Sequence, residues 1–257
     1  MCSMNLILVV FSMVSVMTAG GVVQNPLDPA TINFIHQLDN KWIANKAILG
    51  VTLPVENKTI VSGEDLTLHC EIGGIPTPAI RWAHNGVIIS QGVYGNINFE
   101  EKLMNRGREP TETGIMAVML TIPCAQSTHS GVYTCFGFNG HTMVESSAEI
   151  VVEGSSKECP TEPKVAPKIV AHTDSRAENQ GNTATLVCAS DIPAHWTWTF
   201  NGVDITEQKG RYQIKSHGSL MIHQIAFADL GSYYCTASNE FGNSTAETYL
   251  HVTSSHS

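Results

Sequence analysis

Charged residues are scarce in this sequence. Only 14% of the 257 residues are Asp, Glu, Lys or Arg, and no Lys or Arg precedes Lys41. The formal net charge of −9 argues against nucleic acid as a partner and against a polybasic contact with a membrane. A hydrophobic content of 42% nevertheless indicates a chain that folds around a core and is not disordered.

Long hydrophobic runs are also missing beyond the N-terminus, so no later segment reaches the length of a transmembrane helix. The first run, NLILVVFSMVSVM, has thirteen uncharged residues, which suits the apolar part of a secretory signal. Small residues follow it. We therefore expect a signal peptide over 1–20, an N-terminal extension over 21–49 and a secreted, extracellular protein without a membrane anchor. An N-terminal membrane anchor is the alternative.

The usual sequence motifs of catalysis, metal binding and phosphate binding are absent as well. The eleven His residues form no HExxH motif, no two Cys residues are spaced CxxC, and there is no Gly-rich phosphate loop. Scattered surface and strand histidines are the simpler interpretation. We expect a protein that is not an enzyme, with no catalytic residue, no metal site and no cofactor.

Seven cysteines are present, and removal of the signal would remove Cys2. Six cysteines in an oxidising compartment predict three disulfides.

The chain contains an internal repeat. Each half has a Cys on an alternating apolar strand, a Trp 10 to 12 residues later, an Asn-Gly turn, a Leu-x-Ile strand and a final Gly-x-Tyr-x-Cys. Short alternating strands separated by regular turn signals predict an all-β fold. The matching residues are Cys70, Trp82, Tyr133 and Cys135 in the first half, and Cys188, Trp198, Tyr233 and Cys235 in the second.

This spacing resembles that of immunoglobulin domains of the intermediate set (I-set). The resemblance implies an all-β fold of two tandem immunoglobulin-like β-sandwiches, over 50–153 and 167–254, joined by a Pro- and Ser-rich linker over 154–166. Before them, Asp28 and Pro29 are typical of a helix start, and the apolar spacing that follows predicts a short N-terminal helix over 29–46.

The same resemblance implies the pairing of the core cysteines. Cys70 would bond Cys135 and Cys188 would bond Cys235, with Trp82, Tyr133, Trp198 and Tyr233 packed around them. In the second domain it also implies an ion pair between Asp229 and Arg211. The first domain has His129 where that Asp would stand, so we expect no such pair there.

Two such domains, a signal and no anchor resemble two narrower groups of secreted proteins. One is the nematode family of two-immunoglobulin proteins that hold axons in place. The other is the group of insect two-immunoglobulin proteins that bind insulin-like peptides. The first resemblance implies an extracellular recognition protein that maintains axon or neuron position. The second implies a soluble binder that sequesters an insulin-like peptide. The partner would accordingly be a cell-surface receptor, an adhesion protein or such a peptide.

Cys124 and Cys159 remain after the core pairs are formed. Cys124 aligns with Gln224 of the second half and follows Leu120 and Ile122, the inward residues of its strand, so it faces outward. In an immunoglobulin sandwich this strand ends at the pole from which the last strand leaves. We therefore predict a Cys124–Cys159 disulfide that fastens the linker to domain 1.

Strand parity indicates a candidate partner-binding face in the first domain. With Tyr133 and Cys135 pointing inward, alternate residues of that strand and of its neighbour point outward, and several are apolar or aromatic. A contiguous exposed apolar patch with Arg is typical of a binding surface. The residues of this predicted face are Arg81, Ala83, Val132, Phe136 and Phe138.

Three other interpretations of this face stay open. The helix over 29–46 could cover it, a second copy of the chain could pack on it as a homodimer, or the aromatics could be ordinary surface residues.

The segment YGNINFEEKLMNRGREPTETG makes the first domain longer than the second. Its mixed charges and lack of period predict extra edge strands or a mobile loop, which would carry recognition or be solvated filler. Two sequons, NKT at Asn57 and NST at Asn243, predict N-glycosylation.

Overall fold

The computed structural model describes residues 47–89, 98–159, 165–206 and 210–254 and, nearer the N-terminus, the short paired strands β1 (Met17–Thr18) and β2 (Gly21–Val22). The rest of the predicted signal peptide and the helix expected over 29–46 lie outside the described residues. We refer to the strands β3 to β10 as domain 1 and to the strands β11 to β19 as domain 2.

Domain 1 is a sandwich of two sheets. In LTLHCEIGGI, the sequence of β5, alternate residues are buried, which is the pattern of a strand with one face on a core. One sheet has the order β4-β10-β9-β6-β7, and β3, β5 and β8 form the other. The strands are β3 (Ile48–Leu53), β4 (Lys58–Val61), β5 (Leu66–Ile75), β6 (Ala79–His84), β7 (Val87–Ile89), β8 (Thr113–Ile122), β9 (Gly131–Phe138) and β10 (Met143–Glu153).

Domain 2 repeats this architecture. Its smaller sheet has the order β12-β17-β16, and β14, β18 and β19 belong to the larger one. A one-turn 3-10 helix precedes β18, as another precedes β9: η2 (Phe227–Asp229) and η1 (Ser127–His129). The strands are β11 (Ile169–Asn179), β12 (Ala184–Leu186), β13 (Cys188–Ser190), β14 (His195–Phe200), β15 (Val203–Asp204), β16 (Tyr212–Ile214), β17 (Leu220–Ile222), β18 (Gly231–Asn239) and β19 (Gly242–Thr253). The expected all-β fold of two tandem sandwiches is confirmed.

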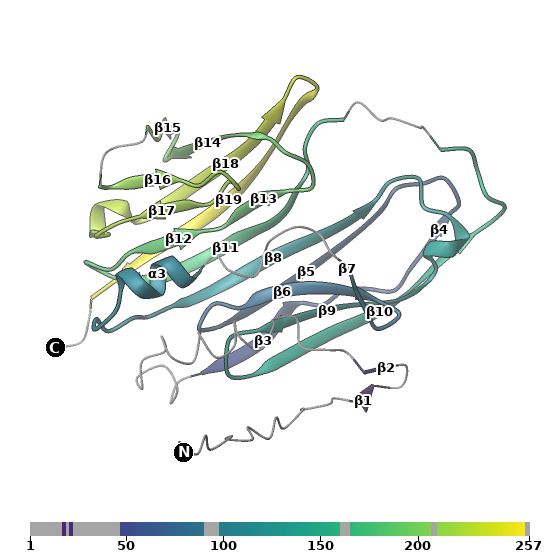
Figure 1. Cartoon of the computed structure of the whole chain (residues 1–257), viewed down its shortest axis with the longest axis horizontal. Helices are drawn as coiled ribbons and strands as arrows, with labels where there is room; N and C mark the ends of the chain where they lie inside the picture. Colours follow the sequence, from purple (N-terminus) through teal and green to yellow (C-terminus); the bar gives the residue numbers. More distant parts are fainter. Residues whose placement is uncertain are drawn as a thin grey trace, which may run out of the picture.

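The two domains share one sheet. Strand β8 of domain 1 pairs antiparallel with β11 of domain 2, from Thr113↔Ala177 to Val118↔Ala171. The result is a nine-stranded sheet of order β15-β14-β18-β19-β11-β8-β5-β3, with β13 also paired to β11. Figure 1 shows β11 and β8 side by side where the sandwiches meet.

The segment between β7 and β8 of domain 1 explains how this junction can form. Among the described residues, the segment between β7 and β8 forms the helix α3 (Asn98–Met104) and no strand. The outer edge of β8 is therefore open to β11, whose pairing satisfies backbone groups that an edge strand would otherwise leave unpaired.

Besides the backbone hydrogen bonds, hydrophobic side chains pack across the junction. Ala171 and Val187 of domain 2 pack in the core cluster of domain 1, and Met119 of domain 1 packs against the core cluster of domain 2. Each core is thus completed by residues of the other domain.

Candidate partner-binding surface

The predicted core residues meet inside the two sandwiches. Both core disulfides are formed, each with a Cα–Cα distance of 6.5 Å. The Trp on the neighbouring strand is buried in both domains, as is the Tyr two residues before the second Cys. The residues are Cys70, Cys135, Trp82 and Tyr133 in domain 1, and Cys188, Cys235, Trp198 and Tyr233 in domain 2.

Both tyrosines close a turn onto the preceding 3-10 helix. The Tyr133 hydroxyl donates to the His129 carbonyl oxygen at 2.8 Å, and the Tyr233 hydroxyl donates to the Asp229 carbonyl oxygen at 2.9 Å. In domain 2 the Arg211 guanidinium donates to both carboxylate oxygens of Asp229. These two residues lie together as the resemblance implied. Burial raises the pKa of the Tyr233 phenol, which keeps it a donor.

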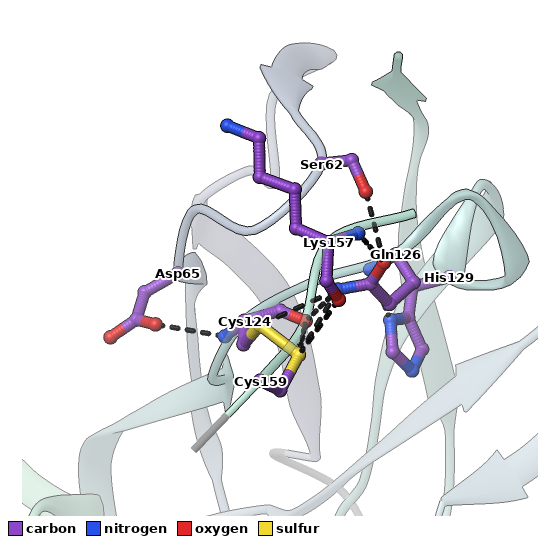
Figure 2. Close-up of a disulfide and its surroundings, with 7 residues drawn as sticks. All are labelled: Ser62, Asp65, Cys124, Gln126, His129, Lys157 and Cys159. Atoms are coloured by element: carbon purple, nitrogen blue, oxygen red, sulfur yellow. Dashed lines mark hydrogen bonds between the residues drawn. A yellow bond between two sulfur atoms is a disulfide. The ribbon is translucent and has the colours of Figure 1, made fainter. Parts of the chain in front are cut away.

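Cys124 and Cys159 form a disulfide at one pole of domain 1, with a Cα–Cα distance of 5.9 Å. Figure 2 shows the polar contacts around it. The Gln126 amide nitrogen donates to the Cys124 carbonyl oxygen at 3.1 Å, and its oxygen accepts from the Lys157 backbone N–H at 3.0 Å. Asp65 caps the Cys124 backbone N–H at 2.9 Å. The linker is therefore held to domain 1 by one covalent bond and several hydrogen bonds.

The predicted aromatic face is not an exposed surface. Ala83 and Phe136 are fully buried and Phe138 is 8% exposed. Strand parity does place Phe136 away from the disulfide core, but there it packs with Ala83 and Met143 in a separate small cluster. The expectation that these three residues contact a partner, or a second copy of the chain, is therefore wrong for this structure.

The other two residues of that predicted face are more exposed than these three. Val132 is 45% exposed and Arg81 is partly buried. The helix over 29–46 that could cover the face lies outside the described residues.

The insertion of domain 1 is not solvated filler. Within α3, Glu101 is 2% exposed, and its carboxylate bonds the guanidinium of Arg176 on β11. Arg176 also donates to Glu178 at 2.8 Å, and the other Glu101 oxygen accepts from the Thr185 backbone N–H at 2.7 Å. Sequence reasoning missed this interface because the charges carry no helical period and their partner lies 75 residues away.

A second buried ion pair lies beside the first. Lys102 Nζ is 3.4 Å from Glu112 Oε2, and both side chains are 7% exposed. Burial raises the pKa of Glu112 to about 7, against the attraction of Lys102 and Arg176. Burial also raises the pKa of Glu101, which Arg176 opposes. The junction therefore holds three buried carboxylates, counting Glu178, and two cations.

Further polar contacts complete the attachment of the insertion. The Asn105 side chain makes a two-point contact with the backbone of Thr183, at 2.8 and 2.7 Å. At the start of α3, Lys215 Nζ donates to Glu100 at 2.6 Å. These contacts fix both ends of α3 on domain 2.

The outer face of the shared sheet extends over both domains, although Ala117, on this face of β8, is buried. Residues paired across neighbouring strands project to the same face. One such row crosses both domains, and its members alternate along each strand with buried core residues such as Leu250 and Val118. The row consists of Ser232, Tyr249, Ser175, Ile115, Gly73 and Gly50.

Neighbouring rows add aromatic and ionisable side chains to this outer face. Tyr249 is 36% exposed and its ring lies 4.6 Å from that of His251. A hydrogen bond with Glu247 raises the pKa of Tyr234. On the domain 1 half, His69 lies 3.4 Å from Glu71. Tyrosine is enriched in protein interfaces, and a flat face with mixed chemistry suits protein recognition more than small-molecule binding.

Both predicted sequons lie on exposed residues. Asn57 Oδ1 accepts from the Glu149 backbone N–H at 2.8 Å, which leaves its amide nitrogen for a glycan. Asn243 pairs with Ser238 at the far end of the outer face of the shared sheet. Glycosylation of either remains a prediction.

The part of the chain that the structure describes contains no group of three or more His, Cys, Asp or Glu residues placed to hold a metal ion. Of the helices described, none is long and apolar enough to cross a membrane.

The sequence is similar to proteins of known family. A family model of the immunoglobulin domain matches residues 50–139 and 166–239. The zwei Ig domain protein zig-4 of Caenorhabditis elegans is 38% identical over 224 residues, which is 87% of this chain and 87% of that protein. The protein zig-3 of the same organism is 36% identical over 253 residues, which is 98% of this chain and 99% of that protein.

A solved structure shares the fold. The crystal structure of neural ectodermal development factor IMP-L2 matches with a TM-score of 0.64 and 21% identity, over 82% of this chain and 97% of that one. The chain therefore belongs to the immunoglobulin domain family and, within it, to the zwei Ig domain proteins.

Proposed function

We propose that the protein is a secreted extracellular recognition protein that binds a protein partner on the outer face of the nine-stranded sheet, in maintaining axon or neuron position. The observation that supports this site is the unbroken row from Ser232 to Gly50, which neither domain could present alone. The membership in the zwei Ig domain family supports binding, and not catalysis, as the mode of action.

A rigid junction supports the same site. A partner that covers both halves of the face requires the domains to stay in register, and the β8–β11 ladder and the buried ion pairs of α3 hold them there. Preorganisation of this kind reduces the entropy lost on binding.

The second candidate is a soluble binder that sequesters an insulin-like peptide, as the resemblance to the insect proteins implies. The small residues at the domain 1 edge of the face favour it. Gly50 lies on the edge strand β3 and Gly73 on its neighbour β5, and no described atom lies within 4 Å of a Cβ built on Gly50, so there is room for a compact peptide close to the backbone at this edge.

Crosslinking and capture from extracellular fluid separate the two candidates. A membrane ectodomain or matrix protein supports the axon role, and a small disulfide-rich peptide supports sequestration. Recovery of neither class, with the chain folded and glycosylated, would count against both.

Two substitutions test the surface itself, one in each half. Tyr249→Ala and Ile115→Ser should each weaken binding of the captured partner by about 30-fold, the effect of a hot-spot residue, with little change in melting temperature. Val151→Ala is the matched control, because Val151 is 37% exposed on the other sheet of domain 1. If Ile115→Ser binds like the control, the face is not shared by the domains.

A further inference from the structure

The Cys124–Cys159 disulfide differs from the two core disulfides in its access to solvent. All four core cysteines are fully buried, whereas Cys124 and Cys159 are partly exposed at the pole of domain 1. A dissolved thiol cannot reach a sulfur atom inside a sandwich unless the domain opens. It can reach this pole in the folded protein, and access is one of the factors that control the rate of thiol–disulfide exchange.

One side chain donates hydrogen bonds to both sulfur atoms of this disulfide. The Gln126 amide nitrogen lies 3.1 Å from Cys159 Sγ and 3.4 Å from Cys124 Sγ (Figure 2). A disulfide sulfur is a weak acceptor, but a thiolate is charged and accepts strongly. The contact from Gln126 therefore gains most when the bond between the sulfur atoms breaks and one of them carries the charge.

The other end of the Gln126 amide fixes the orientation of this donor. Its oxygen accepts from the Ser62 hydroxyl at 3.0 Å and from the Lys157 backbone N–H at 3.0 Å. A flipped amide would set its nitrogen against the Lys157 N–H, donor against donor. The nitrogen is thus held toward the sulfur atoms before any reaction begins, and a donor already in place costs no reorganisation when charge develops.

The two sulfur atoms are not equivalent. Cys159 Sγ is the closer one to the Gln126 donor, and it also lies 3.3 Å from the Cys124 carbonyl oxygen, an acceptor for a thiol. A freed Cys159 therefore has a donor in place for its thiolate and an acceptor in place for its thiol. A disulfide opens more readily when its reduced form is stabilised, and the better-stabilised sulfur is the better leaving group.

We propose that the Cys124–Cys159 disulfide is a thiol–disulfide exchange site, which a small aliphatic thiol of the glutathione type opens in the folded protein. The thiolate of that molecule forms a new S–S bond with Cys124 Sγ. The Cys124–Cys159 bond breaks, its electron pair leaves on Cys159 Sγ, and Cys159 takes up the equivalent of the proton that the small thiol lost. One disulfide replaces another, so the step needs no oxidant.

Exchange at this site would release the linker from domain 1 and leave the cores closed. The contacts that remain at the pole are hydrogen bonds, such as the one from the Lys157 N–H to Gln126. The core disulfides and the β8–β11 ladder lie elsewhere. Because the chain keeps Cys159 near the pole, its thiol can displace the small thiol again, which makes the modification reversible.

Reduced glutathione is the probe that tests this site. The full-length protein is incubated with it in native buffer, and exchange is quenched with acid at successive times. Peptide mapping by mass spectrometry gives the fraction of each cysteine present as glutathione adduct, free thiol or native disulfide. Two variants are compared. Gln126→Glu keeps an oxygen for Ser62 and Lys157 but replaces the donor by a carboxylate oxygen, and Thr128→Glu adds the same charge at an exposed position of η1.

At early times we expect the adduct on Cys124 and the free thiol on Cys159, with all four core cysteines still in their native disulfides. Exchange should be about tenfold slower in Gln126→Glu than in Thr128→Glu, because tenfold corresponds to about one hydrogen bond to a charged group. Hydrogen exchange at residues 154–159 should be faster in the adduct than in the native protein.

Three results would each overturn the proposal: an adduct mainly on Cys159, core disulfides that open as fast as this one, or equal rates in the two variants. The first two need no variant, so they hold even if Gln126→Glu fails to fold. Unchanged hydrogen exchange at 154–159 would likewise contradict release of the linker. None of these results bears on binding at the outer face of the shared sheet.

Discussion

Arg176 lies at the centre of the buried ion pairs of the domain junction. Its side chain is 3% exposed and donates to Glu101 of domain 1, to Glu178 of its own strand and to Thr77 Oγ1 at 3.0 Å. Arg176→Met keeps most of the apolar volume and removes the charge. Two buried carboxylates then face each other without a cation, which is unfavourable because desolvated charges of like sign are no longer compensated.

The size of the expected loss of stability follows from this geometry. Removing one partner of a buried ion pair destabilises by about 3–5 kcal/mol, and here one guanidinium serves two carboxylates, so we expect a loss of about 5 kcal/mol near neutral pH. The loss should shrink in mildly acidic buffer, because burial already raises the pKa of Glu101 and removal of Arg176 would raise it further. The double variant Glu101→Gln/Arg176→Met should recover much of the stability.

Urea denaturation followed by intrinsic fluorescence measures these changes. Arg106→Met, at an exposed arginine of the same insertion, is the control and should stay within about 0.5 kcal/mol of the natural protein. A loss below about 1 kcal/mol for Arg176→Met would refute the reasoning, since it would mean that the cluster is solvated.

Three further predictions concern other parts of the fold. Because the pKa of Glu112 is about 7 in the folded protein against an ordinary value of 4.5, its contribution to stability is full below pH 4.5 and is lost as pH rises through 7. Unfolding free energy should fall by about 3 kcal/mol over this range, and Glu112→Gln should flatten the slope in urea titrations at several pH values. Replacing Cys124 and Cys159 by Ala should lower stability by about 3–4 kcal/mol and speed hydrogen exchange at the start of β11; unchanged exchange would show that the brace does not position the strand. Phe136→Ala should lower stability by about 3–5 kcal/mol in thermal or urea unfolding, whereas an effect within about 0.5 kcal/mol would show that its burial is not retained in solution.

The internal repeat made most of the fold predictable. A Cys, a Trp and a Gly-x-Tyr-x-Cys at matched spacing fix the strands that build each core, because the disulfide and the ring must meet between two sheets. The same alignment predicted the outward position of Cys124, and the structure places it within bonding distance of Cys159. These features are local or recur in both halves.

The surface was less predictable. Strand parity determines to which face of a sheet a side chain points, but not what packs against that face. Phe136 points away from the core disulfide as expected and is nevertheless buried. The outer face of the shared sheet could not be foreseen, because it depends on the pairing of β8 with β11 across the domain boundary. A signal was present in the insertion, where FEEKLMN could form a helix, but its partner Arg176 gave no pattern of its own.

The edge of β8, which no described strand of domain 1 covers, and the charged helix α3 are parts of one arrangement. Without a described strand beside it, β8 would expose its backbone edge, and an exposed edge invites unspecific pairing with other chains. Strand β11 removes that risk, but a ladder of this kind can slip in register. The contacts of α3 oppose slippage, because a shift of one residue would turn Arg176 to the opposite face and leave Glu101 buried without a cation. The buried charges therefore set the register of the ladder, and the register sets which side chains meet on the outer face.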